Sequence, residues 1–332
     1  MKNGDDSLLF KFYRMSPETF DALHDMVRDR LSKEFGYLSS GMLIRYAAMA
    51  FRVGLETARE AIHLTCSVLW EVLSPMYMKP PPEGDCRDIA AGFCSRWQFP
   101  KCLAPIPLCS WLWPTASTYL FRLIDVGAPG RFSDGGIFKN SPIGKRLHEG
   151  KLNLPRAAML PGSEKVCPHV FVGDEAFQLR PDFMRPLPGT RTEAEEVIFN
   201  YRLSRARRCV ENAFGILVSR WRIYERQINL QPENADNVVK ATCILPNFLS
   251  MTTNAAATYR PPGYADCHDV FGSVRNGTWP QGTASAAVFG LQGAKVHNST
   301  NVANSVRKVF MNYFKNEGQV AGQWDLPGVT RP

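Results

Sequence analysis

Two acidic residues stand where a folded chain could use them for chemistry. Asp174 follows the apolar run 170–172 and Gly173. If that run forms a buried strand, the Asp174 carboxylate lies at the edge of the sheet. Open α/β sheets have their active sites at this edge. Glu211 lies 37 residues later, beside the apolar stripe of a predicted helix. If that helix packs across the sheet, both carboxylates can converge on one divalent cation, and hard carboxylate oxygens suit Mg²⁺ or Mn²⁺.

A third acid, Asp134, lies in a glycine-rich stretch that reads Ser-Asp-Gly-Gly. We count it as a candidate metal ligand beside Asp174 and Glu211. Each acid also has a simpler interpretation. Asp134 and Asp174 are residue types that ordinary turns use, and Glu211 could form an ion pair with an arginine one turn earlier on its helix.

Arginines concentrate around these acids. The predicted DNA contacts among them are Arg205, Arg207, Arg208, Arg220 and Arg222, and Arg202 and Arg226 lie nearby. Hydrolysis of a phosphodiester needs a metal that activates the nucleophile and cations that hold the backbone, so this combination favours a nuclease. A solvated basic helix face is the alternative.

Composition bounds the possible classes of protein. The chain has 332 residues, 45% hydrophobic and 21% charged, which is typical of a folded globular protein. Its net charge of +8 favours a polyanionic partner, with nucleic acid first. Nine cysteines without a C-x-x-C pair indicate neither a disulfide framework nor a zinc ribbon. The polar start of the chain does not resemble a secretory signal, and prolines interrupt the uncharged run 102–121, so we predict no membrane segment.

The first part of the chain, residues 1–79, is predicted to be a helical domain. A helix opens at Ser16-Pro17, and two more cover 42–51 and 56–73, with a Val-Gly-Leu turn between them. Helix, tight turn and helix resemble a helix-turn-helix, although a helical hairpin that packs only on itself fits equally well. The proline-rich stretch 78–84 then marks a boundary.

Residues 85–251 are predicted to form an α/β domain. A strand is expected within 166–173, and helices over 193–222 and 237–251. Residues 252–300 lack periodicity and are interpreted as a mostly disordered spacer. Residues 301–332 form a C-terminal helix, over 302–314, and a tail.

Several ordered motifs resemble one family. They are Ile124–Gly136, Val172–Phe177, Met184–Pro186, Phe199–Arg208 and Val210–Gly215, with Met15–Phe20, Trp97–Cys102 and the closing Val306–Phe314. Together they resemble the Harbinger (PIF-type) transposase-derived nucleases, which belong to the DDE superfamily endonucleases. The resemblance covers nearly the whole chain.

This resemblance implies a fold and an activity. The expected fold is α/β, an RNase H-like mixed sheet with flanking helices, behind the helical N-terminal domain. Asp174 would be the second catalytic aspartate, Glu211 the helix-borne glutamate and Asp134 an additional ligand of the Mg²⁺ or Mn²⁺ cofactor. The implied partners are DNA and a Myb-like accessory protein, and the implied location is the nucleus, with the cytoplasm as a second compartment.

One part of the chain departs from the family pattern. The family's first catalytic aspartate belongs just after Cys102, where this chain has no acid in 103–108. We therefore predict that the first strand is missing or garbled, with residues 103–120 aberrant, and interpret 108–118 as out-of-frame translation of the ancestral second strand. Loss of one carboxylate from a metal cluster should cost activity, so the alternative function is a catalytically inactive DNA- or protein-binding remnant.

Overall fold

The computed structural model divides the chain into two compact units. Unit 1 comprises residues 1–79, 213–265 and 277–288, and unit 2 comprises 80–212, 266–276 and 289–332. The structure describes residues 15–27, 36–106, 119–127, 134–189, 193–252, 259–268, 274–278, 300–327 and 329. The long helix α9 (Ala194–Arg220) contributes residues to both units.

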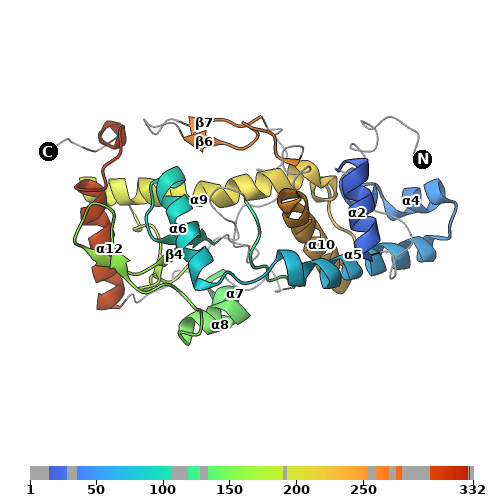
Figure 1. Ribbon diagram of the computed structural model, residues 1–332, viewed down its shortest axis with the longest axis horizontal. Coiled ribbons are helices and arrows are strands. Elements are labelled where there is room, and N and C mark those ends of the chain that lie inside the picture. The colour runs from blue at the N-terminus through green and yellow to red at the C-terminus, as the bar shows by residue number, and fades with distance from the viewer. Residues whose placement is uncertain are drawn as a thin grey trace. The chain divides into compact units, whose positions relative to one another are not determined.

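Unit 1 is built from helices (Figure 1). They are α2 (Pro17–Val27), α3 (Gly36–Ser40), α4 (Ile44–Phe51), α5 (Leu55–Tyr77), the 3₁₀ helix η2 (Arg222–Glu225) and α10 (Pro232–Met251). The buried residues Ile62, Cys66, Leu69 and Leu73 recur along one stripe of α5. Helix α10 packs against α5, and the side-chain amide of Asn247 donates to the Tyr77 carbonyl at 2.7 Å.

The packing of α10 explains where the observed units differ from the expected domains. The segment 213–251 groups with the N-terminal helices rather than with the rest of 85–251. The residues of α10 from Ala241 to Leu249 are all buried, and α5 supplies the apolar surface that covers part of them. Pro246 lies inside α10 and does not end it, because tertiary packing offsets the hydrogen bond that proline cannot make.

A helix, a turn and a second helix occupy the region expected to resemble a helix-turn-helix. Helix α4 ends at Phe51 and is followed by Arg52, whose φ of 55° lies in the left-handed region. The amide of Val53 then donates to the carbonyl of Ala48 at 3.0 Å, and α5 begins two residues later. Four residues on α4 and in this turn expose large apolar side chains, namely Tyr46, Met49, Phe51 and Val53.

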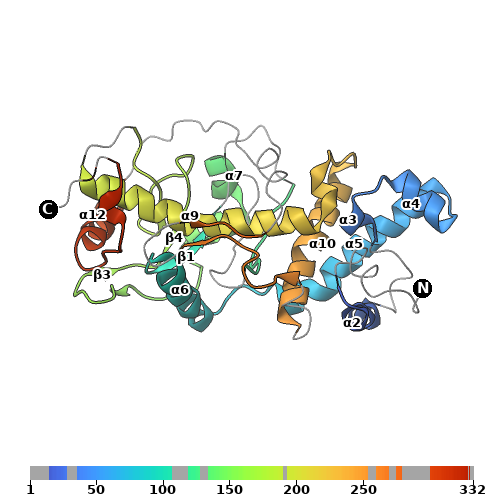
Figure 2. The same cartoon turned by 90° about the horizontal axis from the view of Figure 1, so that it is seen from above.

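Unit 2 contains a parallel sheet with strand order β1-β4-β5. The strands are β1 (Cys102–Pro105), β4 (Val170–Val172) and β5 (Phe183–Met184). Each neighbouring pair runs parallel, and the amide of Ile106 donates to the Val172 carbonyl at 2.8 Å, one residue beyond β1. Figure 2 shows β1 and β4 between α6 (Glu83–Trp97) and α9.

The strand β1 corrects part of the prediction for residues 103–120. That prediction held the first strand to be missing or garbled, yet Leu103 and Ala104 form a fully buried strand beside β4. The two prolines at 105 and 107 concealed it in the sequence. Pro105 lies at the end of the strand, where a missing amide is tolerated. The predicted out-of-frame segment 108–118 lies outside the described residues.

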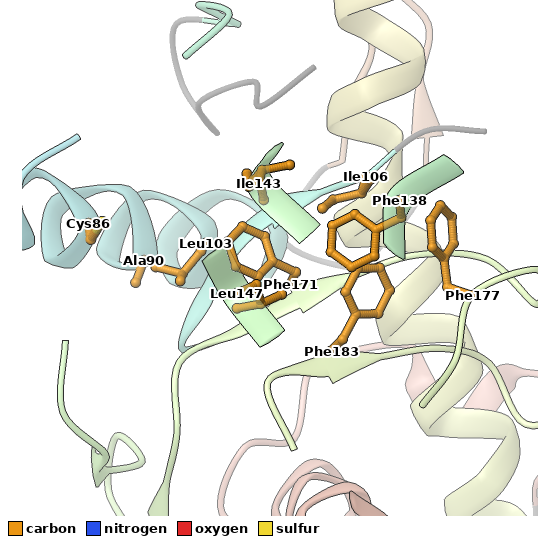
Figure 3. Close-up of a cluster of buried hydrophobic side chains, with 11 residues drawn as sticks. Cys86, Ala90, Leu103, Ile106, Phe138, Ile143, Leu147, Phe171, Phe177 and Phe183 are labelled. Atoms are coloured by element: carbon orange, nitrogen blue, oxygen red, sulfur yellow. The ribbon is translucent and has the colours of Figure 1, made fainter. Parts of the chain in front are cut away.

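A cluster of buried side chains covers one face of this sheet. Figure 3 shows Leu103 of β1 and Phe171 of β4 packed among residues of α6, α7 (Asp134–Asn140) and α8 (Pro142–His148). Its members are Cys86, Ala90, Leu103, Ala104, Ile106, Phe138, Ile143, Leu147, Phe171, Phe177 and Phe183. Toward α9, burial and the neighbouring Cys209 raise the pKa of the Cys102 thiol. The sheet therefore lies in a covered core, with α9 beside it.

Smaller elements complete unit 2. They are the antiparallel pairs β2 (Ala158–Met159) with β3 (Val166–Cys167) and β6 (Cys267–His268) with β7 (Val274–Arg275), helix α12 (Asn301–Lys315) and the 3₁₀ helix η3 (Gln323–Asp325). The β6–β7 pair lies inside the predicted spacer 252–300, so that part of the interpretation differs from the structure. Among the described helices, none combines the length and apolar character that crossing a bilayer requires.

Candidate active site

Asp174 lies two residues beyond β4, at the carboxyl end of the parallel sheet. Its Oδ1 accepts a hydrogen bond from the Ala176 amide at 2.9 Å, and only 15% of its side chain is exposed. The strand-end position follows from the apolar run that precedes it, as predicted from the sequence. An acid at this edge of a sheet stands where open α/β folds bind their ligands.

The loop that carries Asp174 is held tightly. A Cβ on Gly173 would meet the rings of Phe177 and Phe183 at 2.6–2.7 Å, so only glycine permits this packing of the aromatic rings on the backbone. On the other side of the loop, Nη1 of Arg185 donates to the Glu175 carbonyl at 2.9 Å. Nothing in the sequence around Arg185 indicates this contact, by which its guanidinium helps to hold the loop that bears Asp174.

The start of α7 lies against the same loop. A Cβ on Gly135 would meet the Ala176 carbonyl oxygen at 2.7 Å, so the backbones approach closely there. Asp134 is the neighbour of Gly135 and the first residue of α7. Its backbone is therefore beside the loop that bears Asp174, while its side chain lies outside the described residues.

Helix α9 approaches Asp174 through Arg207. One guanidinium nitrogen of Arg207 lies 3.9 Å from Oδ2 of Asp174. Glu211 follows Arg207 by four residues and is exposed, so it lies on the same helix face, about 6 Å further along the axis. The structure thus brings the helix face of Glu211 to the sheet edge of Asp174, although it pairs Asp174 with arginine and not with the glutamate itself.

Burial is the main electrostatic influence on Asp174. It raises the pKa of this carboxyl, while the Ala176 amide and the Arg207 guanidinium act in the opposite direction without reversing the shift. A carboxylate that is costly to ionise in the folded protein gains stability from a nearby cation. A candidate functional residue is typically perturbed in this way.

The donor set fits a hard divalent cation. Carboxylate oxygens, such as those of Asp174 and Glu211, are the ligand type that Mg²⁺ and Mn²⁺ prefer. Asp134 is next to Gly135, whose backbone approaches the Asp174 loop. Within the described residues, no group of three or more His, Cys, Asp or Glu side chains lies close enough to hold a metal ion. The third carboxylate of the predicted set belongs to Asp134.

Two of the predicted DNA-contacting arginines are buried. Arg205 is 3% exposed and donates to Oε1 of Gln98 and to the Tyr201 hydroxyl at 3.4 Å. Arg220 is 8% exposed, donates to the Tyr259 carbonyl and lies 4.5 Å from the Tyr264 ring centre. These guanidinium groups hold other segments of the chain in place, so neither is available to a phosphate backbone in this structure.

The other predicted arginines keep contact with solvent. Arg207 and Arg208 are partly exposed on α9, and Arg222 is exposed in η2, where it pairs with Glu225 at 3.1 Å. The signal that distinguishes the two groups is absent from the sequence, because nothing local indicates that Gln98 or Tyr259 will meet an arginine more than 35 residues away.

We predict opposite effects for two neighbouring arginines. Arg205→Ala should lower the free energy of unfolding by about 2–3 kcal/mol, because it leaves a cavity and breaks a buried hydrogen bond. Arg208→Ala should stay within about 0.5 kcal/mol of wild type and should instead weaken DNA binding, with the salt slope reduced by about 1. Urea denaturation and filter binding at several salt concentrations measure both effects. Equal stability losses would contradict the assignment.

Strand β1 lacks the acidic residue that the family resemblance places just after Cys102. A parallel strand next to β4 ends at the same edge of the sheet as Asp174, so an acid there would complete the cluster. Residues 102–106 are Cys, Leu, Ala, Pro and Ile, and none is acidic. Residues 107–118 lie outside the described part of the chain.

Part of the chain is similar to a known protein family. Residues 111–247, which include all three candidate acids, match the family model of the DDE superfamily endonucleases. This stretch of the chain is therefore similar to the endonuclease domains of that superfamily. The mixed α/β architecture with a small parallel sheet is consistent with the fold of such a nuclease domain. Strand β1 precedes the matched residues.

One curated relative was found in a plant. The chain is 32% identical over 133 residues to a protein named "Protein ALP1-like" from Arabidopsis thaliana, which is 39% of this chain and 32% of the relative. The chain thus spans about a third of the length of the relative it matches. No solved structure matches this chain.

Proposed function

We propose that this protein is a divalent-metal-dependent DNA endonuclease of Harbinger transposase descent, with an RNase H-like core. The observation that carries the proposal is the contact between Arg207 of α9 and Asp174 at the carboxyl end of β4. That contact brings the helix face of Glu211 to the sheet edge. The close approach of Gly135 to the same loop brings in Asp134, and the endonuclease family match covers all three positions.

Each residue has a role in the proposed reaction. Asp174 and Glu211 would hold the cation, with Asp134 as a further ligand. DDE superfamily endonucleases generally use divalent metals, and a bound metal supplies an activated water and neutralises charge that develops on the phosphate. Arg207, beside Asp174, would bind the scissile phosphate, and Arg185 would keep the Asp174 loop in position.

The partner and the cellular location follow from the same proposal. The net charge of +8 and the exposed Arg222 favour DNA as substrate. The family resemblance supports a Myb-like accessory protein and a nuclear location. Arg208, which is partly exposed on α9 and precedes Glu211 by three residues, is the residue from which we expect a contact to the DNA backbone.

Nicking of a supercoiled plasmid tests the proposed function. Full-length protein in Mn²⁺ should convert the plasmid to the open circular form. Glu211→Gln removes one candidate ligand charge and should slow nicking at least about 100-fold. Glu164→Gln is the matched control, because Glu164 is also exposed and lies outside the candidate site; it should nick at the wild-type rate.

The absence of an acid in residues 102–106 defines the competing outcome. If folded wild-type protein fails to nick the plasmid, the chain is an inactive remnant that has kept the fold without the chemistry. If Glu211→Gln nicks as fast as wild type, the activity comes from another site or from a contaminant. Either result overturns the proposal.

A further inference from the structure

A second site lies at the opposite edge of the sheet from Asp174. Lys101 immediately precedes β1 and His169 immediately precedes β4, and the Val170 amide donates to the Lys101 carbonyl at 2.9 Å. Because β1 and β4 are parallel, both side chains belong to the amino edge. A cavity of about 610 Å³ is lined there by residues of α6, β2 and these two strand starts.

The lining of this cavity is cationic. Arg87, Lys101 and Arg156 contribute to it, and none of the lining residues in the described part of the chain is acidic. Arg87 also pairs with Glu83 on the surface of α6. Lys101 and Arg156 form no ion pair with any residue that the structure describes. Their charges are therefore available to an anionic ligand.

His169 adds a buried polar group to the same cavity. It is 6% exposed, and its Nδ1 has no hydrogen-bond partner among the described residues. Burial first and then Lys101 lower the pKa of the imidazole, while the backbone of Pro155 and Arg156 acts in the opposite direction without reversing the shift. Buried polar atoms in folded proteins almost always have a partner, so an unsatisfied nitrogen in the wall of a cationic cavity points to a missing ligand.

We propose that this cavity binds a phosphate group carried by a ligand of about mononucleotide size. Its volume lies within the range of pockets that enclose small molecules. The walls between the cations are alanine and proline side chains, such as Ala90 and Pro161, which suit a base or another flat apolar group. Lys101 and Arg156 bind the phosphate, and Nδ1 of His169 is a further hydrogen-bonding group for the ligand in the cavity wall. The ligand is a free nucleotide or one nucleotide unit of a DNA strand.

Calorimetry with the full-length protein tests this site. The probes are adenosine monophosphate, adenosine and a single-stranded oligonucleotide of about ten nucleotides. Adenosine monophosphate should bind, and the double variant Lys101→Gln/Arg156→Gln should bind it at least about tenfold more weakly. The control Lys145→Gln/Lys308→Gln removes the same charge from exposed positions outside the cavity and should bind like wild type.

Each outcome decides a separate point. Tighter binding of the oligonucleotide than of the monophosphate, lost in the double variant, identifies DNA as the source of the phosphate; the reverse order identifies a free nucleotide. Equal binding of adenosine and its monophosphate, or equal loss in the control, overturns the proposal.

Arg156→Gln alone, at an exposed residue, repeats the test if the double variant does not fold. Asp174→Asn should bind the monophosphate like wild type, which separates this site from the proposed nuclease.

Discussion

Asp174→Asn is expected to lower plasmid nicking at least about 100-fold without lowering the free energy of unfolding. The asparagine keeps the oxygen that accepts from the Ala176 amide, so the loop retains its hydrogen bond. Burial raises the pKa of the Asp174 carboxyl, which means that its ionised form is disfavoured in the folded protein. Removal of that charge relieves this cost and removes the proposed metal ligand together.

The sign of the pH dependence follows from the raised pKa. The stability cost of ionised Asp174 is absent below the pKa of the unfolded chain and is fully present above the higher pKa of the folded protein. The stability gain of Asp174→Asn over wild type should therefore be near zero at about pH 3.5 and should grow as the pH rises. Urea denaturation of both proteins at about pH 3.5 and at about pH 7 measures this difference in the free energy of unfolding.

A matched control uses another aspartate of the same unit. Asp182 accepts two hydrogen bonds from Arg180, at 2.7 and 3.0 Å. Asp182→Asn should lose about 0.5–1 kcal/mol of stability and should keep nicking. A loss of more than about 1 kcal/mol in Asp174→Asn would mean that this carboxylate is structural.

Arg202→Met is expected to cost about 3 kcal/mol of unfolding free energy. Arg202 is 2% exposed, and its Nη1 donates to the Gly318 carbonyl at 2.7 Å while its Nη2 donates to the Gln98 carbonyl. The guanidinium carbon also lies 4.4 Å from the centre of the Phe314 ring. Methionine fills much of the volume but leaves two carbonyls without donors.

Urea denaturation of Arg202→Met and of the exposed control Arg222→Met measures this effect. The control should stay within about 0.5 kcal/mol of wild type. Arg202 joins three segments that are distant in the sequence, namely the end of α6, α9 and the turn after α12. A loss below about 1 kcal/mol for Arg202→Met would show that these segments hold together without the guanidinium.

The helices could be predicted because apolar residues recur at helical spacing. The helix predicted over 193–222 corresponds to α9 (Ala194–Arg220). The helix predicted over 302–314 corresponds to α12 (Asn301–Lys315). Helix α10 begins at Pro232, five residues before its predicted start. Its first turn is polar and so carries no hydrophobic period, and the proline at its first position is the signal that indicates the true start.

Strand β1 could not be predicted from its own residues. A four-residue segment that ends in proline shows neither alternation nor β-branched side chains, and its identity comes from its neighbour β4. The backbone hydrogen bond from Ile106 to Val172 and the burial of Leu103 are properties of the assembled sheet. We predicted a missing strand because the acid that the family resemblance places there is absent. The strand is nevertheless present, without the acid.

The candidate site was accessible to sequence reasoning only in part. The strand-end position of Asp174 could be predicted, because the residues that follow a buried strand lie at a sheet edge. The approach of Gly135 to Ala176 and the role of Arg185 could not, since each depends on a contact between segments that are distant in the chain. Two of the arginines predicted to contact DNA, Arg205 and Arg220, are instead buried. The residue type alone does not decide between these roles, because an exposed arginine can bind phosphate and a buried one binds groups of the protein.

Titration of Mn²⁺ into the wild-type protein and into Asp174→Asn and Glu211→Gln tests most directly whether these two acids share one cation. The account predicts one saturable site in the wild type and a loss of at least about tenfold in affinity in each variant. The control Glu164→Gln should bind like wild type. Wild-type affinity in either Asp174→Asn or Glu211→Gln, or no saturable binding in folded wild-type protein, would contradict the account.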